Sequence, residues 1–364
     1  MPRRIATILA SLLILIVLLC AGMLIKVPYA EMSPGPTVNT LGRHGGSPVL
    51  NIKDHKTYGT SGHLNMTTVR VTGADYRLSL IEAVTGWLQH NRAVVPHSTL
   101  YPDEKSAKEV DQENAEEFSA SQESAKAAAL KQLHIKVSSH IIVGSVVKGG
   151  PAQGKLHAGD VIRAVDGESV REPKQVAQLV TKHKPGQRVE FTVVPARAAK
   201  AAEKARKQPS ASDERRISVG TKKAPDDGRT IVGIQPATGH AFPFPIHIKL
   251  ADVGGPSAGL MFSLGIVDKL TPGKLTGGSF VAGTGTIDDH GKVGAIGGIQ
   301  MKTVAARAKG AQYFLTPPDN CAAAAKEKPD GLTLVKTGTL GDALDSLKKI
   351  REHRTDALPQ CEAG

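Results

Sequence analysis

The chain opens with an apolar run that carries no charged side chain. It covers 21 residues, from 5 to 25, and follows Arg3 and Arg4. At about 1.5 Å per residue, a helix of this length spans roughly 30 Å, the thickness of a bilayer core. A cleaved signal peptide has a shorter apolar region, of about 7–15 residues, so we expect an uncleaved anchor. Arg3 and Arg4 place the N-terminus in the cytoplasm and send the rest of the chain across the membrane.

Beyond the anchor, the apolar positions alternate between helical and strand spacing, which predicts an α+β fold. Residues 64–71 are dense in β-branched side chains and predict a strand, whereas apolar positions in 79–88 recur at helical spacing. The predicted strands are 49–52, 64–71, 217–219, 231–234 and 246–250. The predicted helices outside the central stretch are 79–88, 115–133, 260–270 and 299–309.

The pattern changes in the middle of the chain. Residues 135–194 read as short strands with Gly/Pro turns and one helix over 174–183. Residues 197–216 are rich in Ala, Ser and Lys and predict a long hairpin loop. The last residues, 351–364, are polar and are expected to fray.

The net charge of +12 invites a nucleic-acid interpretation, which the rest of the composition opposes. Residues 197–223 hold nine Lys/Arg against three Asp/Glu, so much of the excess lies in one solvated segment. Aromatic residues make up only 4% of the chain, too few for a surface on which bases stack. We expect no nucleic-acid partner.

The cysteines and the nucleotide motifs suggest no cofactor or metal. Cys20 lies in the apolar run, and whether Cys321 and Cys361 pair is left open. There is no CxxC or Cys/His cluster of the kind that binds zinc. Residues 149–155 have the glycine and lysine spacing of a P-loop, but Leu156 stands where Ser or Thr should hold magnesium.

The first candidate for chemistry is Ser257, which lies in the sequence Gly255-Pro256-Ser257-Ala258-Gly259 just before an apolar helix. Its small neighbours leave room for a substrate carbonyl. The N–H groups at the start of a helix lack intrahelical partners and can stabilise an oxyanion. A serine is a weak nucleophile, however, and needs a base.

Lys302 is the candidate base. It follows the glycine pair Gly297-Gly298 by four residues and lies 45 residues after Ser257, in a predicted helix whose apolar side chains can surround it. Burial disfavours the ammonium form and lowers the pKa of a lysine, as a lysine base requires.

Taken together, residues 246–317 resemble the proteolytic domain of Lon proteases. The resemblance lies in the serine motif, in the glycine-rich stretch 291–302, and in Thr284-Gly285 between them. It implies that Ser257 is the nucleophile, that Lys302 is the base and that Thr284 supports the lysine by hydrogen bonding. It also implies a domain that forms rings, so a homo-oligomer is an expectation by analogy.

The sequence departs from that family at two positions. Gly254 stands before Gly255 where many Lon enzymes carry an acid, and Thr286 stands where glutamate is usual. Neither departure removes the dyad.

Residues 143–194 resemble bacterial PDZ domains. The resemblance lies in Gly150-Pro151-Ala152, in Gly159-Asp160 and in the strand and turn from Val161 to Gly167. It implies a partly open β-barrel with a helix, which binds an extended peptide beside one strand. We expect the groove near residues 133–145 and the helix that begins at Lys174.

These features predict five segments. Residues 1–26 form the cytoplasmic end and anchor, 27–133 an αβ segment, 134–223 the PDZ domain with its basic loop, 224–350 the Lon-type domain and 351–364 a polar tail. The segment 27–133 resembles the early strands and helix of a Lon-type domain, so the PDZ domain is expected to interrupt a split peptidase.

The expected function is a membrane-anchored, ATP-independent serine endopeptidase that cuts unfolded or extended polypeptides, with a PDZ peptide ligand. One alternative is a hydrolase with a Ser-Asp-His triad, which would use His290 with Asp288 or Asp289. Asp-Asp-His-Gly reads as an exposed turn, however. The other alternative is a catalytically silent PDZ scaffold on a Lon-like fold.

Overall fold

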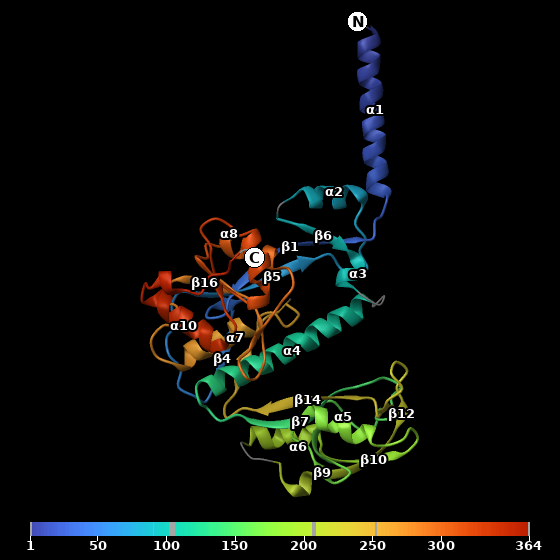
Figure 1. Ribbon diagram of the computed structural model, residues 1–364, viewed down its shortest axis with the longest axis vertical. Helices are drawn as coiled ribbons and strands as arrows, with labels where there is room; N and C mark the ends of the chain where they lie inside the picture. The colour runs from blue at the N-terminus through green and yellow to red at the C-terminus, as the bar shows by residue number, and fades with distance from the viewer. Residues whose placement is uncertain (1, 90, 102–105, 206–208, 252, 363–364) are drawn as a thin grey trace. The chain divides into compact units, whose positions relative to one another are not determined.

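The computed structural model describes residues 2–89, 91–101, 106–205, 209–251 and 253–362. Residues 102–105, 206–208 of the basic stretch, 252 of the loop before the serine and 363–364 of the tail lie outside the described residues. The chain folds into two compact units (Figure 1): unit 1 combines Met1–His134 with Ile246–Gly364, and unit 2 is Ile135–Pro245.

Unit 1 holds most of the helices and a mixed sheet. Its helices are α1 (Pro2–Leu24), α2 (Leu80–Leu88), α3 (His97–Leu100), α4 (Ala107–Gln132), α7 (Gly259–Leu270), α8 (Ile299–Ala308), α9 (Cys321–Lys326) and α10 (Leu340–Arg351), with 3-10 turns η3 (Pro318–Asn320) and η4 (Thr355–Ala357). Its strands are β1 (Tyr29–Asn39), β2 (Arg43–His44), β3 (Ser47–Pro48), β4 (Leu50–Ile52), β5 (His63–Val71), β6 (Ala93–Pro96), β15 (Ile246–Ile248), β16 (Phe280–Gly283), β17 (Thr286–Ile287), β18 (Val293–Gly294), β19 (Tyr313–Thr316) and β20 (Thr333–Lys336).

The main sheet of unit 1 joins strands from both ends of the chain. Its order is β20-β19-β16-β5-β1-β6. β5 runs parallel to β16, and β19 and β20 continue the parallel pairing, whereas β1 is antiparallel to β5 and β6. The early segment therefore completes the same sheet as the late one.

Helices cover both faces of this sheet. On one face, α8 and α9 enclose an apolar cluster that includes Ala282 of β16 and Phe314 of β19. Gly283, the next residue of β16, points to the other face, where an added Cβ would lie 2.7 Å from Met261 of α7. This face is covered by α7, which α4 and α10 back.

Two helices begin where the sequence provides a capping box. Ser79 caps α2 with Glu82, and Ser106 caps α4 with Glu109. In each, the serine hydroxyl accepts from the third helical N–H while the glutamate accepts from the cap N–H. α4 starts before the predicted first residue at 115, because the capping box of Ser106 and Glu109 satisfies the N–H groups of an earlier, polar first turn.

The N-terminal helix α1 confirms a candidate membrane span. Residues Arg3–Leu24 are long and apolar enough to cross a bilayer, with a mean hydropathy of 2.8. Cys20 lies exposed on this helix.

The described part of unit 2 is built on one main sheet, a two-stranded ribbon and two helices. Its strands are β7 (Ser138–Val146), β8 (Val161–Val165), β9 (Glu168–Ser169), β10 (Arg188–Val194), β11 (Arg215–Gly220), β12 (Lys222–Lys223), β13 (Thr230–Ile231) and β14 (Ile234–Ala241); its helices are α5 (Pro173–Thr181) and α6 (Ala196–Lys204), with the 3-10 turn η2 (Ala211–Asp213). The predicted hairpin between β10 and β11 is present, but its connection contains the helix α6. The N–H of Ala196, the first residue of α6, donates to the buried carboxylate of Asp160.

The sheet of unit 2 extends further along the chain than the sequence suggested. Its order is β11-β10-β8-β7-β14, so β14 belongs to unit 2 although residue 223 was expected to end this domain. β7 pairs with β8 on one edge and with β14 on the other. The expectation of a peptide groove beside residues 133–145 is therefore wrong for strand addition. The edge of β7 with which a peptide would have to pair is already paired with β14.

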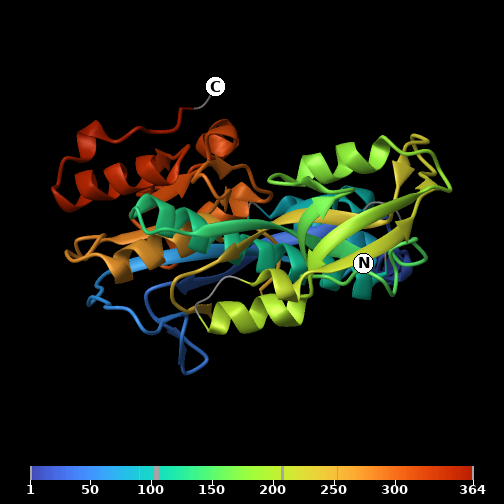
Figure 2. The same ribbon diagram turned by 90° about the horizontal axis from the view of Figure 1, so that it is seen from below.

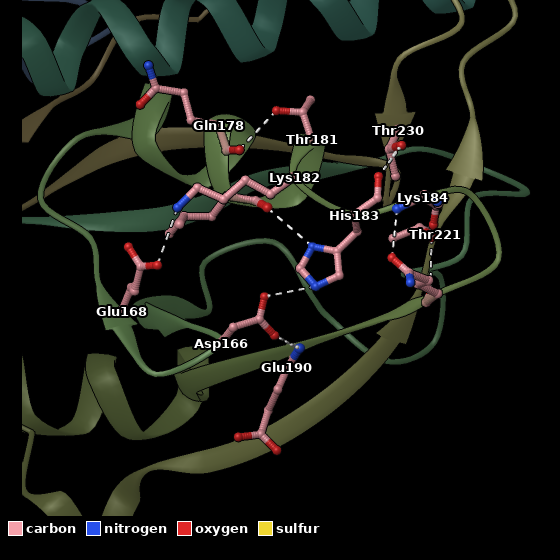
Figure 3. Close-up of polar contacts among 12 residues, drawn as sticks. Asp166, Glu168, Gln178, Thr181, Lys182, His183, Lys184, Glu190, Thr221 and Thr230 are labelled. Carbon is pink, nitrogen blue, oxygen red and sulfur yellow. Dashed lines mark hydrogen bonds and ion pairs between the residues drawn. The ribbon is translucent and has the colours of Figure 1, made fainter.

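Helix α5 is fastened to the rest of unit 2 at its C-terminal end (Figure 3). His183 Nε2 lies 3.3 Å from Asp166 Oδ2, and Asp166 Oδ1 accepts from the backbone N–H of Glu190 at 2.9 Å. The hydroxyl of Thr230 donates to the carbonyl of His183 at 2.6 Å. These bonds join α5 to β10 and β13, and they fix the helix beside β14.

The described part of the C-terminal tail is held in place rather than frayed. Figure 2 shows this red segment turning back after α10 and running alongside the rest of unit 1. Cys361 forms a disulfide with Cys321 across a separation of 40 residues, and its N–H donates to Leu334 of β20. A backbone bond from Lys336 to Pro359 adds to this attachment.

We predict that this disulfide stabilises unit 1. A cross-link over a loop of this length reduces the entropy of the unfolded chain, so replacing Cys321 and Cys361 together by Ser should lower the free energy of unfolding by about 2–4 kcal/mol. Urea unfolding of the full chain with and without the substitutions measures this. Cys20→Ser serves as the control and should leave stability within about 0.5 kcal/mol; an equal loss in that variant would contradict the prediction.

Candidate active site

Ser257 lies in a loop that the long helix α4 holds from behind. Gly255 has φ +77°, and its N–H donates to the carbonyl of Asn114 at 2.9 Å. The hydroxyl of Ser121, one of the buried residues of α4, donates to the carbonyl of Pro256 at 2.9 Å. These two bonds fix the loop on both sides of the turn, so that Ser257 itself remains half-buried with its side chain accessible.

The residues after the serine are small because of close packing. Ala258 is the N-cap of α7, and Gly259 is its first residue. A Cβ at Gly259 would lie 2.9 Å from the Ile287 side chain and 3.0 Å from the Ser121 hydroxyl. Phe262 donates the first helical bond, to Ala258, and the N–H groups of residues 257–259 precede it at the positive end of the helix.

Lys302 projects from the first turn of α8. The N-cap of this helix is Gly298, which has φ +67°, a conformation that favours glycine. A Cβ there would lie 2.8 Å from Val69 of β5 and 2.9 Å from Met32 of β1. The glycine therefore lets α8 start directly against the sheet, which directs Lys302 toward the C-terminal end of β16.

The predicted residues meet at that point. Lys302 Nζ is hydrogen-bonded to Ser257 Oγ at 2.8 Å and to Thr284 Oγ1 at 3.0 Å. The Thr284 hydroxyl donates to the carbonyl of Ser257 at 3.0 Å, and the N–H of Gly285 donates to the same carbonyl at 2.9 Å. Thr284 thus contacts both members of the pair and fixes their separation.

Burial changes the acid–base chemistry of Lys302. Only 2% of the residue is exposed, and this desolvation lowers the pKa of its amine from 10.5 to about 7. Near neutral pH a large fraction of the amine is therefore uncharged and able to accept a proton.

A pocket of about 340 Å³ opens beside the serine. It is lined by Pro256, Ser257, Thr286, Ala295, Ile296 and Gly297. The buried side chain of Asn320 fixes one wall, since its Oδ1 accepts from the N–H of Ile296 and its Nδ2 donates to the carbonyl of the same residue, each at 2.9 Å. The lining is mostly apolar and small, which suits an extended chain beside the nucleophile.

Both departures from the Lon pattern have a place in this geometry. A Cβ at Gly254 would lie 2.8 Å from the Cβ of Asn114, so α4 occupies the space of a side chain there. Thr286 forms part of the pocket wall.

The residues of the alternative triad lie elsewhere. His290 is exposed in the turn between β17 and β18, where its N–H donates to Asp288 Oδ1 at 2.9 Å. In the described part of the chain, no group of three His, Cys, Asp or Glu side chains is placed to hold a metal ion.

Sequence reasoning missed three residues of the site, Asn114, Ser121 and Asn320. All three support the site from elements outside the two motifs, and nothing in their local sequence distinguishes them from other polar residues. Only the tertiary contacts of α4 and η3 reveal their roles.

Family models match two parts of the chain. The model described as PDZ domain matches residues 118–201, and the model described as Lon protease (S16) C-terminal proteolytic domain matches residues 241–347. A comparison with curated proteins finds no match.

Among solved structures, the chain is similar to PDZ domains of SdrC-like proteins from two Listeria species. The domain from Listeria monocytogenes is 19% identical, with a TM-score of 0.21, over 27% of this chain and 87% of that one. The domain from Listeria innocua is 22% identical, with a TM-score of 0.22, over 28% of this chain and 98% of that one. The family models therefore show that this chain contains a PDZ domain and a C-terminal proteolytic domain of the Lon protease (S16) type.

Proposed function

We propose that this protein is a membrane-anchored, ATP-independent serine endopeptidase in which Ser257 is the nucleophile and Lys302 the general base. The contact of 2.8 Å between Lys302 Nζ and Ser257 Oγ carries the proposal. It brings together a hydroxyl and a buried amine of lowered pKa, the two groups that a Ser–Lys dyad requires.

The reaction follows from this arrangement. The uncharged amine of Lys302 accepts the hydroxyl proton of Ser257 as Oγ attacks the carbonyl carbon of a peptide bond. N–H groups of residues 257–259 stabilise the oxyanion. The ammonium then gives its proton to the leaving amine, which leaves an ester on Ser257. Lys302 next accepts a proton from water as the water oxygen attacks the ester carbon. It then returns this proton to Ser257 Oγ as the bond between Oγ and the acyl carbon breaks and the new carboxyl group leaves.

Thr284 positions this pair. Its hydroxyl accepts a hydrogen bond from the lysine amine and donates to the Ser257 carbonyl, so it restrains the base and the nucleophile together. This supports the dyad over the triad alternative, in which His290 would have to leave its exposed turn.

The substrate class follows from what accompanies the site. No nucleotide-binding motif occurs in the sequence, so we infer that the enzyme works without an ATP-driven unfolding step and cuts unfolded or extended segments. The small side chains around the pocket admit such a chain.

Two observations support an extracytoplasmic active site. Arg3 and Arg4 precede the apolar helix α1, and positive residues stay on the cytoplasmic side. The disulfide between Cys321 and Cys361 fits an oxidising compartment, because cytoplasmic thiols are kept reduced.

We infer that the PDZ domain binds an extended peptide between β14 and α5. β14 ends the order of the sheet, and α5 packs against it. An edge strand can add a peptide by main-chain hydrogen bonds, with side-chain selectivity supplied by the neighbouring helix. Such a groove would select or hold substrate segments.

The dyad predicts which substitutions abolish activity. In detergent and without ATP, the full chain should cleave unfolded casein, and Ser257→Ala or Lys302→Ala should each lower kcat by at least about 100-fold. Circular dichroism checks that both variants fold, and His290→Ala is the control that should retain activity. Activity that survives Lys302→Ala but not His290→Ala would establish the triad. No cleavage, together with no labelling of Ser257 by a serine-reactive probe, would indicate the silent scaffold.

The lowered pKa of Lys302 predicts a pH profile. Because only the uncharged amine accepts the proton, kcat/KM should rise with pH up to about 7 and level off above it. A profile that stays flat from pH 5.5 to 8.5 would contradict lysine as the base. The measurement uses an uncharged peptide or ester substrate, so that substrate ionisation does not contribute.

The same burial should cost stability. The unfolded amine keeps its proton up to about pH 10.5, whereas the folded one loses it near pH 7. The penalty is therefore full below pH 7 and disappears as pH rises toward 10.5. Lys302→Met should stabilise the chain by roughly 2–4 kcal/mol at pH 7, and less at pH 10, in urea unfolding. The matched control is Lys309→Met, an exposed lysine at the C-cap of the same helix, which should change stability by under about 0.5 kcal/mol.

Hydrogen exchange tests the position of the PDZ groove. In the Ser257→Ala variant, which should bind without cutting, unfolded casein should slow amide exchange in β14 and leave β7 unchanged, because β7 is already paired on both edges. Protection confined to β7, or absent from unit 2, would place the ligand elsewhere.

A further inference from the structure

Helix α2 presents an apolar stripe to solvent. Four of its large apolar side chains are exposed: Leu80 by 41%, Val84 by 47%, Trp87 by 76% and Leu88 by 67%. At 3.6 residues per turn these positions share one face of the helix. Exposed apolar side chains at single positions are ordinary, but a continuous stripe that includes the only tryptophan of the chain marks an interaction surface.

The opposite face fixes α2 on unit 1. Ala83 and Gly86 are buried there. A Cβ at Gly86 would lie 2.9 Å from Glu31 of β1 and 2.9 Å from Val94 of β6, so the glycine lets the helix rest directly on the sheet edge. With this face packed and the helix start capped by Ser79, the apolar stripe cannot turn inward.

α2 is also joined to the end of the membrane-span candidate. Leu80 N donates to the carbonyl of Ile25 at 2.9 Å, and Val27 N donates to the carbonyl of Leu78 at 2.8 Å. A Cβ at Gly22 of α1 would lie 3.0 Å from Ile81 of α2. Figure 1 shows α2 beside the end of α1, which extends away from the rest of unit 1.

We propose that the apolar stripe of α2 lies in the interfacial layer of the bilayer that α1 spans, so that unit 1 is attached to the membrane by a transmembrane helix and by an in-plane helix beside it. This rests on the proposed membrane anchoring of α1. A lipid surface is the occupant because the backbone bonds hold α2 at the level where the apolar run ends, which is where the headgroup region begins.

The side chains around α2 suit that layer. Trp and Tyr concentrate at membrane interfaces, and Lys near a helix end places its amine among the headgroups. Here Lys26 follows the apolar run directly, and its amine lies 5.3 Å from the ring centre of Tyr76. The Tyr76 hydroxyl donates to Glu82 at 2.7 Å, which keeps the exposed ring beside the start of α2. Apolar faces of interfacial helices enter the bilayer by about 5–10 Å.

The attachment restrains the peptidase. A single helix anchor leaves a domain free to rotate about it, whereas a second contact beside the anchor restricts the orientation of unit 1 at the membrane. The sheet edge at β1 and β6, on which α2 rests, would then face the bilayer.

Trp87 provides a direct probe, because it is the only tryptophan of the chain. The full chain is reconstituted in vesicles of phosphatidylcholine and phosphatidylglycerol, with or without lipids brominated on the acyl chain. We expect blue-shifted emission that brominated lipids quench, and quench more strongly when the bromine lies near the headgroup than when it lies near the chain end.

Variants show whether the stripe causes this. Val84→Glu combined with Leu88→Glu should reduce the quenching by at least about twofold, because carboxylates oppose insertion. The matched control is Val147→Glu in unit 2, since Val147 is 46% exposed, close to the value for Val84, and should leave the quenching unchanged. Circular dichroism checks that each variant folds. The quenching of the unsubstituted chain tests the inference even if a variant does not fold.

Each outcome has one meaning. Flotation of the chain with the vesicles tests α1, and failure to float would overturn both the anchoring and this inference. Flotation without quenching by brominated lipids would overturn the inference and leave the anchoring intact. A blue shift that depends on the protein-to-lipid ratio and is not quenched would assign the stripe to a second copy of the chain. The casein assay, which depends on the dyad, is separate from all three.

Discussion

The desolvated amine of Lys302 is the constraint on which the arrangement of unit 1 depends. A lysine buried to this extent needs hydrogen-bond acceptors. Lys302 projects from α8, and its two partners come from two other elements: Ser257 from the loop before α7 and Thr284 from the end of β16. The parallel pairing of β5, β16 and β19 sets the level at which these elements meet. Without that sheet, nothing would hold the first turns of α7 and α8 beside one another.

The sequence predicted that Ser257 and Lys302 act as a pair, and the structure brings the two side chains into contact, because both lie in short motifs whose glycines have local causes. Gly298 is required by the contact of α8 with β1 and β5, and Gly259 by the contact of α7 with Ser121, so the spacing of the motifs carries the geometry. The supporting residues could not be predicted in this way. Asn114 and Ser121 act on the serine loop from a helix more than a hundred residues earlier, and Asn320 acts on the pocket wall from a 3-10 turn, so their roles exist only after folding.

The fold shows the same division between local and long-range information. The strand predicted at 246–250 and the helices predicted at 260–270 and 299–309 correspond to β15, α7 and α8 within two residues, because their apolar spacing is local. The position of β14 was not predicted, because its own sequence carries little apolar alternation and its pairing with β7 joins residues that are far apart in the chain. The expectation of strand addition at β7 failed for that reason, because β14 already pairs with it. The pairing of Cys321 with Cys361 was equally out of reach, since two cysteines define a pair only when the fold brings them together.

The buried amine of the site lowers the stability of unit 1, and contacts around the site offset that loss. Lowering the pKa of Lys302 to about 7 means that the folded state forgoes a proton that the unfolded state retains at neutral pH, which weakens folding. The contacts that offset this cost lie around the site rather than in it: the capped helix α4 behind the serine loop, and the disulfide that ties the tail to α9. Both restrict motion without adding charge near the amine. A salt bridge to Lys302 would also have stabilised the fold, but it would have raised the pKa of the amine and kept it protonated at neutral pH. The support therefore comes from hydrogen bonds to the backbone and from a covalent link, which add no charge beside Ser257 and Lys302.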